Sequence, residues 1–400
     1  MSSRISTSMM YSQSVALMMS KQAKLSHLEQ QIATGSKILS AKDDPVSAGA
    51  AVGLDRSLAA LDRMKLNAGN VQNRLGVQEN TLAQVGDMMG RINELTIYAH
   101  NPALAPADKQ SLVTELKAIR DNLLSLANSS DGTGRYLFGG TNDGDPPFSQ
   151  VGGKIVYSGD QTQRKVEIGP DTYVQDALPG SEIFLRIPTG DGFVDGGPVA
   201  GNTGTGVLTN VTRDGSSTWN GQSFSVRFTA ADQYEVLDAG GTVVGTGNMK
   251  TGDDIVVNGV RMHIDGKPAA GDSFAVTPSS SRDIFGTLDA LIGTLEADTG
   301  SPAKLAVQQN ALQSSLRDVA RAAERMIDSR AAGGAQLKAL DNAADMREAN
   351  GVTLKTTLSQ MRDVDYADAM SQYQLESTAL QAAQTLFSQM QSMSLFNKIR

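Results

Sequence analysis

The sequence contains no cysteine and few aromatic residues. Without cysteine, the chain has no disulfide bonds, no thiolate nucleophile and no cysteine-ligated metal. Aromatic residues make up 5% of the 400 residues, with a single tryptophan, so we do not expect a large globular enzyme core. The three histidines (His27, His100 and His263) lie in three different segments and lack a metal-binding spacing. We therefore expect no catalytic residues, no metal and no cofactor.

Clustered positive charge and long apolar runs are also missing. Lys and Arg total 35 against 43 Asp and Glu, a net charge of -8, which argues against binding to a nucleic-acid backbone. No run of eighteen apolar residues is present, so we expect no membrane span. The first 22 residues lack the uninterrupted apolar stretch of a cleaved secretory signal, so export would need a different machine.

The composition changes sharply in the middle of the chain. Residues 140–282 hold 24 of the 40 glycines and 8 of the 12 prolines. Short runs rich in β-branched and aromatic residues, such as "KIVYS", "RKVEI", "IFLRI" and "QSFSVRFT", alternate there with glycine-rich turns. An Asn258-Gly259 pair between two apolar runs is a strong hairpin signal. These features predict an all-β domain over residues 142–279.

Both flanks of this β segment show helical heptads. The N-terminal flank repeats apolar residues at alternating spacings of three and four, with Gln78 as the polar exception, at Leu61, Met64, Ala68, Val71, Leu75, Gln78, Leu82, Val85, Met89 and Ile92. The C-terminal flank repeats at Leu305, Leu312, Val319 and Met326 and then meets Gly333-Gly334, which is either a kink or a break. We predict an antiparallel rod of long helices over residues 46–141 and 280–363, and the fold class is α+β multidomain with an inserted β domain.

The two ends of the chain carry narrower amphipathic stripes. Residues 1–45 and 364–400 are predicted as one terminal helical domain whose apolar area is too small to fold alone, so it is disordered in the monomer. Two interpretations fit: ordinary helices that pack on the rod, or helices that polymerise with copies of the chain.

The stretch "IATGSKILSAKDDPVSAG", residues 32–49, joins the first helical segment to the rod. Gly35 interrupts a helix, whereas Ser40, Asp43 and Asp44 are suited to cap the next one, with Pro45 in its first turn. The longer run "IATGSKILSAKDDPVSAGAAVGLDRSL" and the C-terminal "LSQMRDVDYADAMSQYQLESTALQAAQ" resemble the two signatures of the bacterial flagellin superfamily. The resemblance covers residues 1–141 and 280–400.

Within that superfamily, "GRYLFGG" at residues 134–140 and "VNGVRMHIDGKPAAGDSFAVTPS" at 257–279 are similar to the protein that joins hook and filament. The C-terminal "SLFNKIR" differs from the usual leucine-rich ending of flagellins, which fits the same resemblance. This resemblance implies a structural subunit that forms a ring between hook-associated protein 1 and flagellin. It also implies export by the flagellar type III apparatus to the cell exterior and a chaperone on the C-terminal segment before export.

The same resemblance implies two sets of functional residues. The terminal helices are expected to pack in the assembled tube through Leu17, Leu25, Leu28, Ile32, Tyr373, Leu380, Phe387 and Met390. The joints between the terminal helices and the rod are expected at Asp43, Asp44, Pro45, Asp363, Asp365 and Tyr366.

Three alternatives remain at this point. The chain could be a flagellin that forms the long filament itself, the β domain could bind glycans as an adhesin does, or the helices could support an enzyme. The scarcity of histidine and the absence of cysteine disfavour the last of these.

Overall fold

The computed structural model describes residues 7–215, 219–250 and 252–396. The chain forms two compact units. The terminal unit comprises Met1–Leu66 and Ala343–Arg400, and the central unit is Asn67–Asn342. Two helices, α2 (Pro45–Ala99) and α5 (Pro302–Arg362), contribute one end to each unit. Most of the tail 394–400 lies outside the described residues.

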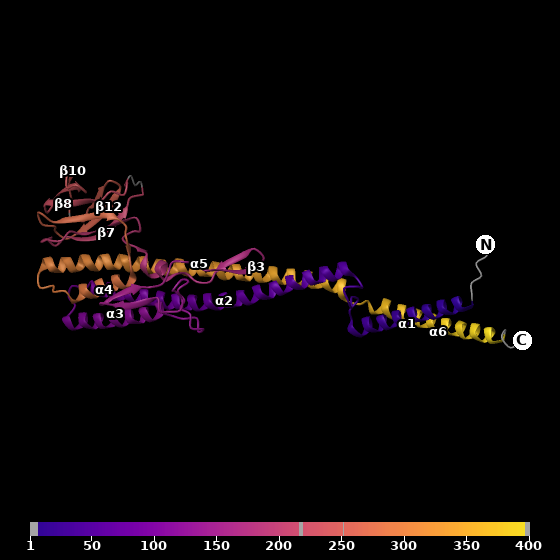
Figure 1. Ribbon diagram of the computed structural model, residues 1–400. Helices are drawn as coiled ribbons and strands as arrows, with labels where there is room; N and C mark the ends of the chain where they lie inside the picture. The colour runs from indigo at the N-terminus through magenta and orange to yellow at the C-terminus, as the bar shows by residue number, and fades with distance from the viewer. Residues whose placement is uncertain (1–6, 216–218, 251, 397–400) are drawn as a thin grey trace. The chain divides into compact units, whose positions relative to one another are not determined.

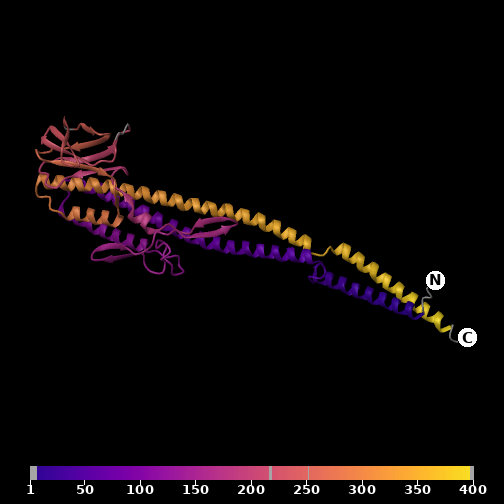
Figure 2. The same cartoon turned by 45° about the horizontal axis from the view of Figure 1, so that its top comes forward.

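The terminal unit is built around two antiparallel helices, α1 (Thr7–Thr34) and α6 (Tyr366–Phe396), which lie side by side (Figures 1 and 2). Their direction follows from their contacts. Near the chain ends, the rings of Tyr11 and Phe387 have centroids 5.0 Å apart. Near the joint, the Tyr373 hydroxyl donates to the Glu29 carboxylate at 2.9 Å.

In the central unit, α2 and α5 also run antiparallel. Glu79 pairs with Arg330 at 2.7 Å, and further along α2 the His100 carbonyl accepts a hydrogen bond from Gln309, which comes earlier in α5. Two shorter helices, α3 (Pro106–Ala127) and α4 (Ile284–Glu296), complete this helical core. Fully buried side chains such as Leu82, Leu116 and Leu312 hold the four helices together.

The predicted heptad seam of α2 is buried from Ala68 to Ile92. Its polar exception has a partner: the side-chain oxygen of Gln78 accepts the backbone N–H of Leu178 at 2.9 Å. The helix α5 runs continuously through Gly333-Gly334. A Cβ built on Gly333 would lie 3.7 Å from the Gln78 amide nitrogen, an ordinary van der Waals distance, so neither the helix nor its packing requires glycine there.

The insertion consists of short strands joined by turns. The first group is β1 (Phe148–Val151), β2 (Lys154–Tyr157), β3 (Lys165–Gly169), β4 (Thr172–Gln175) and β5 (Ile187–Pro188). The second group is β6 (Val194–Pro198), β7 (Val207–Arg213), β8 (Phe224–Ala230), β9 (Gln233–Asp238), β10 (Val243–Asn248), β11 (Asp254–Val257), β12 (Val260–Asp265), β13 (Ser273–Pro278) and β14 (Ser281–Arg282).

Two antiparallel sheets of the second group enclose a core of their own. One sheet has the order β10-β9-β8-β13-β6 and the other β11-β12-β7. Their inner faces bury side chains such as Phe228, Met262 and Phe274. The sheets lie on one side of α5, and α3 and α4 lie on the other (Figures 1 and 2). The predicted architecture of helices with an inserted all-β domain is confirmed.

The first group of strands belongs to the helical core instead. Phe148 in β1 and Phe184 are buried with the helices, and their rings meet edge to face at 5.4 Å. A separate β core is therefore present only in residues 194–278.

One predicted strand is wrong and one predicted turn is confirmed. Most of the run "IFLRI" does not form a strand, because Ser181–Leu185 makes a π-helical turn and only its last residue, Ile187, belongs to the short strand β5. That turn buries the adjacent side chains of Ile183 and Phe184 in one core, whereas a strand would send them to opposite faces. The hairpin of β11 and β12 turns at Asn258 and Gly259, whose φ angles of 50° and 77° suit a two-residue turn.

A buried asparagine of α5 is one of the residues that connect the β domain to the helix, together with Arg317, which donates to the Gly196 carbonyl of β6 at 2.9 Å. The side chain of Asn310 accepts the N–H of Leu208 at 2.8 Å and donates to the carbonyl of Gly206 at 2.9 Å, as a neighbouring strand would. Asn310 is buried, so neither backbone group can turn to water instead.

Replacing Asn310 should weaken the β domain. Asn310→Ala leaves one buried N–H and one buried carbonyl without a partner, which costs about 1–3 kcal/mol for each group left unsatisfied. Trp219 packs against the β core and is the single tryptophan, so its fluorescence reports urea unfolding of this domain. The matched variant Asn342→Ala, at an exposed position of the same helix, should stay within about 0.5 kcal/mol of the parent. Equal midpoints for both variants would contradict this role.

Candidate assembly interface

The inner faces of α1 and α6 form a narrow seam. In α1 the seam positions, spaced by four and three residues, are Ser14, Met18, Lys21, Leu25, Leu28 and Ile32, all partly or fully buried. In α6 they are Ala369, Tyr373, Glu376, Leu380, Ala383 and Phe387. Serine, alanine and charged residues occupy five of these twelve positions, which limits the apolar area of the seam.

The charged seam residues contact one another. The Glu376 side chain is only 6% exposed, and its two carboxylate oxygens accept from the ammonium groups of Lys21 and Lys24, each at 2.6 Å. These hydrogen bonds lower the pKa of Glu376 below its ordinary value. The carboxylate is therefore ionised at neutral pH and held between two cations.

The outer faces of the same helices carry large apolar side chains. The exposed fractions reach 54% for Leu17, 62% for Met19, 67% for Leu375 and 61% for Leu386. These exposed side chains are available for contact with another chain.

Most of the predicted packing residues lie in the seam, and two of them are exposed. The seam contains Leu25, Leu28, Ile32, Tyr373, Leu380 and Phe387. Leu17 and Met390 are exposed in the single chain. The sequence pattern did not point to three further contact residues, Tyr11, Lys21 and Glu376. A strict seven-residue repeat counted back from Leu28 leads to Lys21 and Ser14, so it predicts the lysine.

The joint between the helices is a short antiparallel bridge. Ser36 and Asp363 face each other as an isolated β-bridge. The N–H of Lys37 donates to the carbonyl of Arg362 at 2.6 Å, and the N–H of Val364 donates to the carbonyl of Gly35 at 3.0 Å. The chain therefore leaves α1 and enters α6 at the same level, with its backbone groups paired.

The predicted joint residues lie at and beside this bridge. Asp44 accepts the N–H groups of Val46 and Ser47 and caps α2, which begins at Pro45 as expected. On the other strand, Asp365 accepts the N–H groups of Ala367 and Asp368 and so caps α6.

Asp43 organises the loop rather than a helix end. One carboxylate oxygen accepts the N–H groups of Leu39 and Ser40, and the other lies 3.1 Å from the His27 ring nitrogen. The hydrogen bond from Ser40 lowers the pKa of Asp43, so its stabilising effect is complete above the ordinary carboxyl range and is lost as the pH falls through the lowered value.

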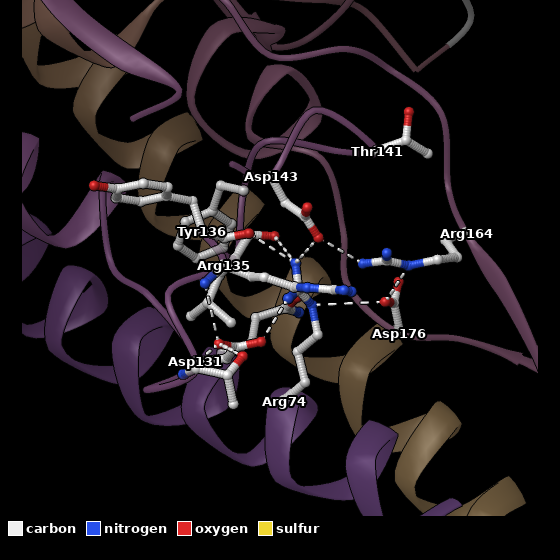
Figure 3. A network of polar contacts seen from close by, with 12 residues as sticks. Arg74, Asp131, Arg135, Tyr136, Thr141, Asp143, Arg164 and Asp176 are labelled. Atoms are coloured by element: carbon white, nitrogen blue, oxygen red, sulfur yellow. Dashed lines mark hydrogen bonds and ion pairs between the residues drawn. The ribbon is translucent and has the colours of Figure 1, made fainter. Parts of the chain in front are cut away.

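A second polar centre holds the "GRYLFGG" segment on α2 (Figure 3). The Arg74 guanidinium, 6% exposed, pairs with Asp131 at 2.9 Å and donates to the Tyr136 carbonyl at 2.7 Å. Arg164 joins the same network through Asp143 at 2.8 Å and Asp176 at 2.7 Å.

The apolar half of that segment enters the helical core. Leu137 and Phe138 are fully buried, and Phe138 meets Phe184 edge to face at 5.3 Å. Gly140 adopts a φ of 70° directly against Asp160, where any side chain would collide. The segment that resembled the junction protein is thus a structural clamp between α2 and the insertion.

In the part of the chain that the structure describes, no cluster of three or more acidic or histidine side chains could hold a metal ion. No helix of residues 7–396 that the structure describes is long and apolar enough to cross a membrane.

Comparison with known proteins agrees with this architecture. Residues 5–143 match the bacterial flagellin N-terminal helical region and residues 316–398 match its C-terminal helical region, which together exceed half of the chain. The chain thus has the organisation of the flagellin superfamily.

More specific relatives are hook-associated proteins. FlgL of Xanthomonas campestris, known from a crystal structure, is 56% identical, with a TM-score of 0.73 over 76% of this chain and 99% of that chain. Flagellar hook-associated protein 3 of Escherichia coli (strain K12) is 24% identical over 98% of both chains. Phase 1 flagellin of Salmonella naestved is 20% identical, over 66% of this chain and 62% of its own. The chain belongs to the FlgL family of flagellar hook-associated proteins.

Removing the central arginine should destabilise the clamp strongly. Arg74→Met keeps most of the side-chain volume but leaves Asp131 without its cation, and breaking a buried pair costs about 3–5 kcal/mol. Urea unfolding followed by far-ultraviolet circular dichroism measures the loss. Arg135→Met, at an exposed arginine of the same segment, should change stability by less than about 0.5 kcal/mol. Similar losses in both variants would show that the network is not the cause.

The joint should be sensitive to its glycine. Gly35 has a φ of 68°, and an added Cβ would lie 3.0 Å from the Tyr366 hydroxyl. Gly35→Ala should therefore cost about 1–2 kcal/mol and speed hydrogen exchange of the Lys37 and Val364 amides about 5- to 30-fold. The control Gly49→Ala, in α2 with open space around the Cβ, should leave exchange at the joint unchanged. Unaltered exchange in Gly35→Ala would count against a constrained joint.

Proposed function

We propose that this protein is a structural subunit that joins the flagellar hook to the flagellin filament and assembles through its terminal helices. Membership of the FlgL family supports the location, and the outer apolar face of α1 and α6 supports the mode of assembly. The role is mechanical, and no catalytic step belongs to it.

The exposed apolar face is the observation that carries this proposal. Leu17 and Met19 on α1, and Leu375 and Leu386 on α6, leave more than half of each side chain in solvent. Burying one such side chain contributes about 1.5–3 kcal/mol. A neighbouring subunit that covers these side chains therefore gains apolar burial that the single chain does not make.

The partners follow from the position in the flagellum. Copies of the chain form a ring, hook-associated protein 1 lies on the hook side, and flagellin lies on the filament side. Export through the flagellar type III apparatus brings the subunit to the cell exterior, and a chaperone covers the C-terminal segment beforehand.

The segments take different places in the assembly. Residues 1–45 and 364–400 form the tube core, residues 46–141 and 280–363 form the rod layer, and residues 142–279 face outward. Leu380 and Phe387 lie in the seam, so aspartate at either position should leave the β domain folded but stop incorporation.

A surface substitution tests assembly without disturbing the seam. Leu375→Asp places a charge on the outer face of α6, where a neighbour would bury it, so swimming of cells that lack their own copy should be lost. Circular dichroism and Trp219 fluorescence of the purified variant should match the parent. Val244→Asp makes the same change at an exposed position of the β domain, 58% exposed, and should leave swimming intact.

Two results would count against the proposal. Normal swimming with Leu375→Asp would show that the outer face is not buried in the flagellum. Extended filaments grown from the purified chain on filament seeds would instead identify a flagellin, because a junction subunit should resist long polymerisation.

A further inference from the structure

The seam between α1 and α6 contains one ionic contact in place of an apolar layer. Glu376 occupies the seam position between Tyr373 and Leu380, and Lys21 occupies the facing position between Met18 and Leu25. Lys24 reaches the second carboxylate oxygen from one turn further along α1. The carboxylate is thus enclosed by the helix pair and neutralised by cations of the partner helix alone.

The apolar seam positions by themselves do not select one partner. Both helices repeat small and apolar residues at spacings of three and four, so a shift of seven residues, or pairing of α6 with another α6, still brings apolar positions together. Copies of the chain that assemble into one ring bring many such helices together. Something else must favour α1 beside α6.

The ionic contact supplies that selection. When α6 pairs with a second α6, Glu376 enters the seam without any lysine to face it, since α6 has no Lys or Arg within the described residues 366–396. When α1 shifts by seven residues toward either end, Glu376 meets Leu28 or Ser14 at the seam in place of Lys21. A buried charge without a counter-ion is strongly unfavourable, whereas the paired state adds little net stability.

We propose that Glu376, held by Lys21 and Lys24, is the specificity determinant of the terminal helix pair: it selects α1 as the partner of α6 and fixes their register. This inference rests on the proposed assembly through the terminal helices. The contact then determines which helix pairs with α6 and adds little to the stability of the pair. Polar residues at single core positions of other coiled coils act in the same way.

Cross-linking the full-length chain tests partner choice directly. The natural chain has no cysteine, so Tyr11→Cys combined with Phe387→Cys introduces one pair of thiols at a contact between α1 and α6. A short bismaleimide then joins the two thiols within a chain when α1 and α6 are in register, and joins separate chains otherwise. Gel mobility separates the two products, measured in concentrated solution and in assembled flagella.

Four variants in this cysteine background distinguish specificity from stability. Glu376→Lys should reduce the intrachain product at least about tenfold, because three cations then meet in the seam. Adding Lys21→Glu and Lys24→Glu to it should restore the product. Glu376→Leu should keep the helix content but lower the ratio of intrachain to interchain product about tenfold. A fully apolar seam no longer favours α1 over another α6 as the partner helix. Glu348→Lys, on an exposed face of α5, should behave as the parent.

The proposal is overturned if Glu376→Lys leaves the product unchanged, if the reversed charges fail to restore it, or if Glu376→Leu keeps the parent ratio. It is also overturned if the parent gives no intrachain product in either state. Failure of the proposed function appears differently: swimming survives Leu375→Asp while the cross-linking results hold.

Discussion

The inserted segment can pack on the helical core only if its backbone polar groups find partners there. The helices supply these partners as amide side chains. At the end of α3, the Asn128 side chain donates to the Phe148 carbonyl at 2.8 Å and accepts the Phe148 N–H at 2.9 Å. The Asn310 side chain makes the same two kinds of hydrogen bond with the backbone of Gly206 and Leu208 at strand β7. Gln78 accepts the N–H of Leu178. Each amide acts as a piece of neighbouring strand and removes the cost of burying an unpaired peptide group.

This constraint explains why the sequence predicts the helices but not the polar contacts between the helices and the inserted segment. The helices follow from periodicity alone, because a seven-residue repeat has one structural solution over such lengths. Gln78 already stood out as a polar break in that repeat, but its partner lies a hundred residues away and no local pattern points to it. The Arg74 network likewise joins α2 to carboxylates that come much later in the chain, so only the fold brings them together.

The terminal helices show the same limit of sequence patterns. A stripe chosen by the largest apolar side chains includes Leu17, which is exposed in the single chain, and its predicted burial in the assembled tube stays a prediction. The seam proper runs through Ser14, Met18 and Lys21, which are less apolar. The run "IFLRI" was misjudged for the same reason: hydrophobicity shows that residues are buried, and only their spacing shows in which element.

The seam of α1 and α6 and their exposed apolar side chains have different roles in the proposed assembly. A strongly apolar α1–α6 seam would also pair with the wrong helix of another copy. Placing a charge in the seam keeps the pair selective at small cost in affinity, since a paired buried charge is nearly neutral and an unpaired one is not. In the proposed assembly, burial of exposed side chains such as Leu17, Met19, Leu375 and Leu386 against neighbouring subunits adds to the binding free energy. Glu376 then contributes selectivity, and these apolar side chains contribute affinity.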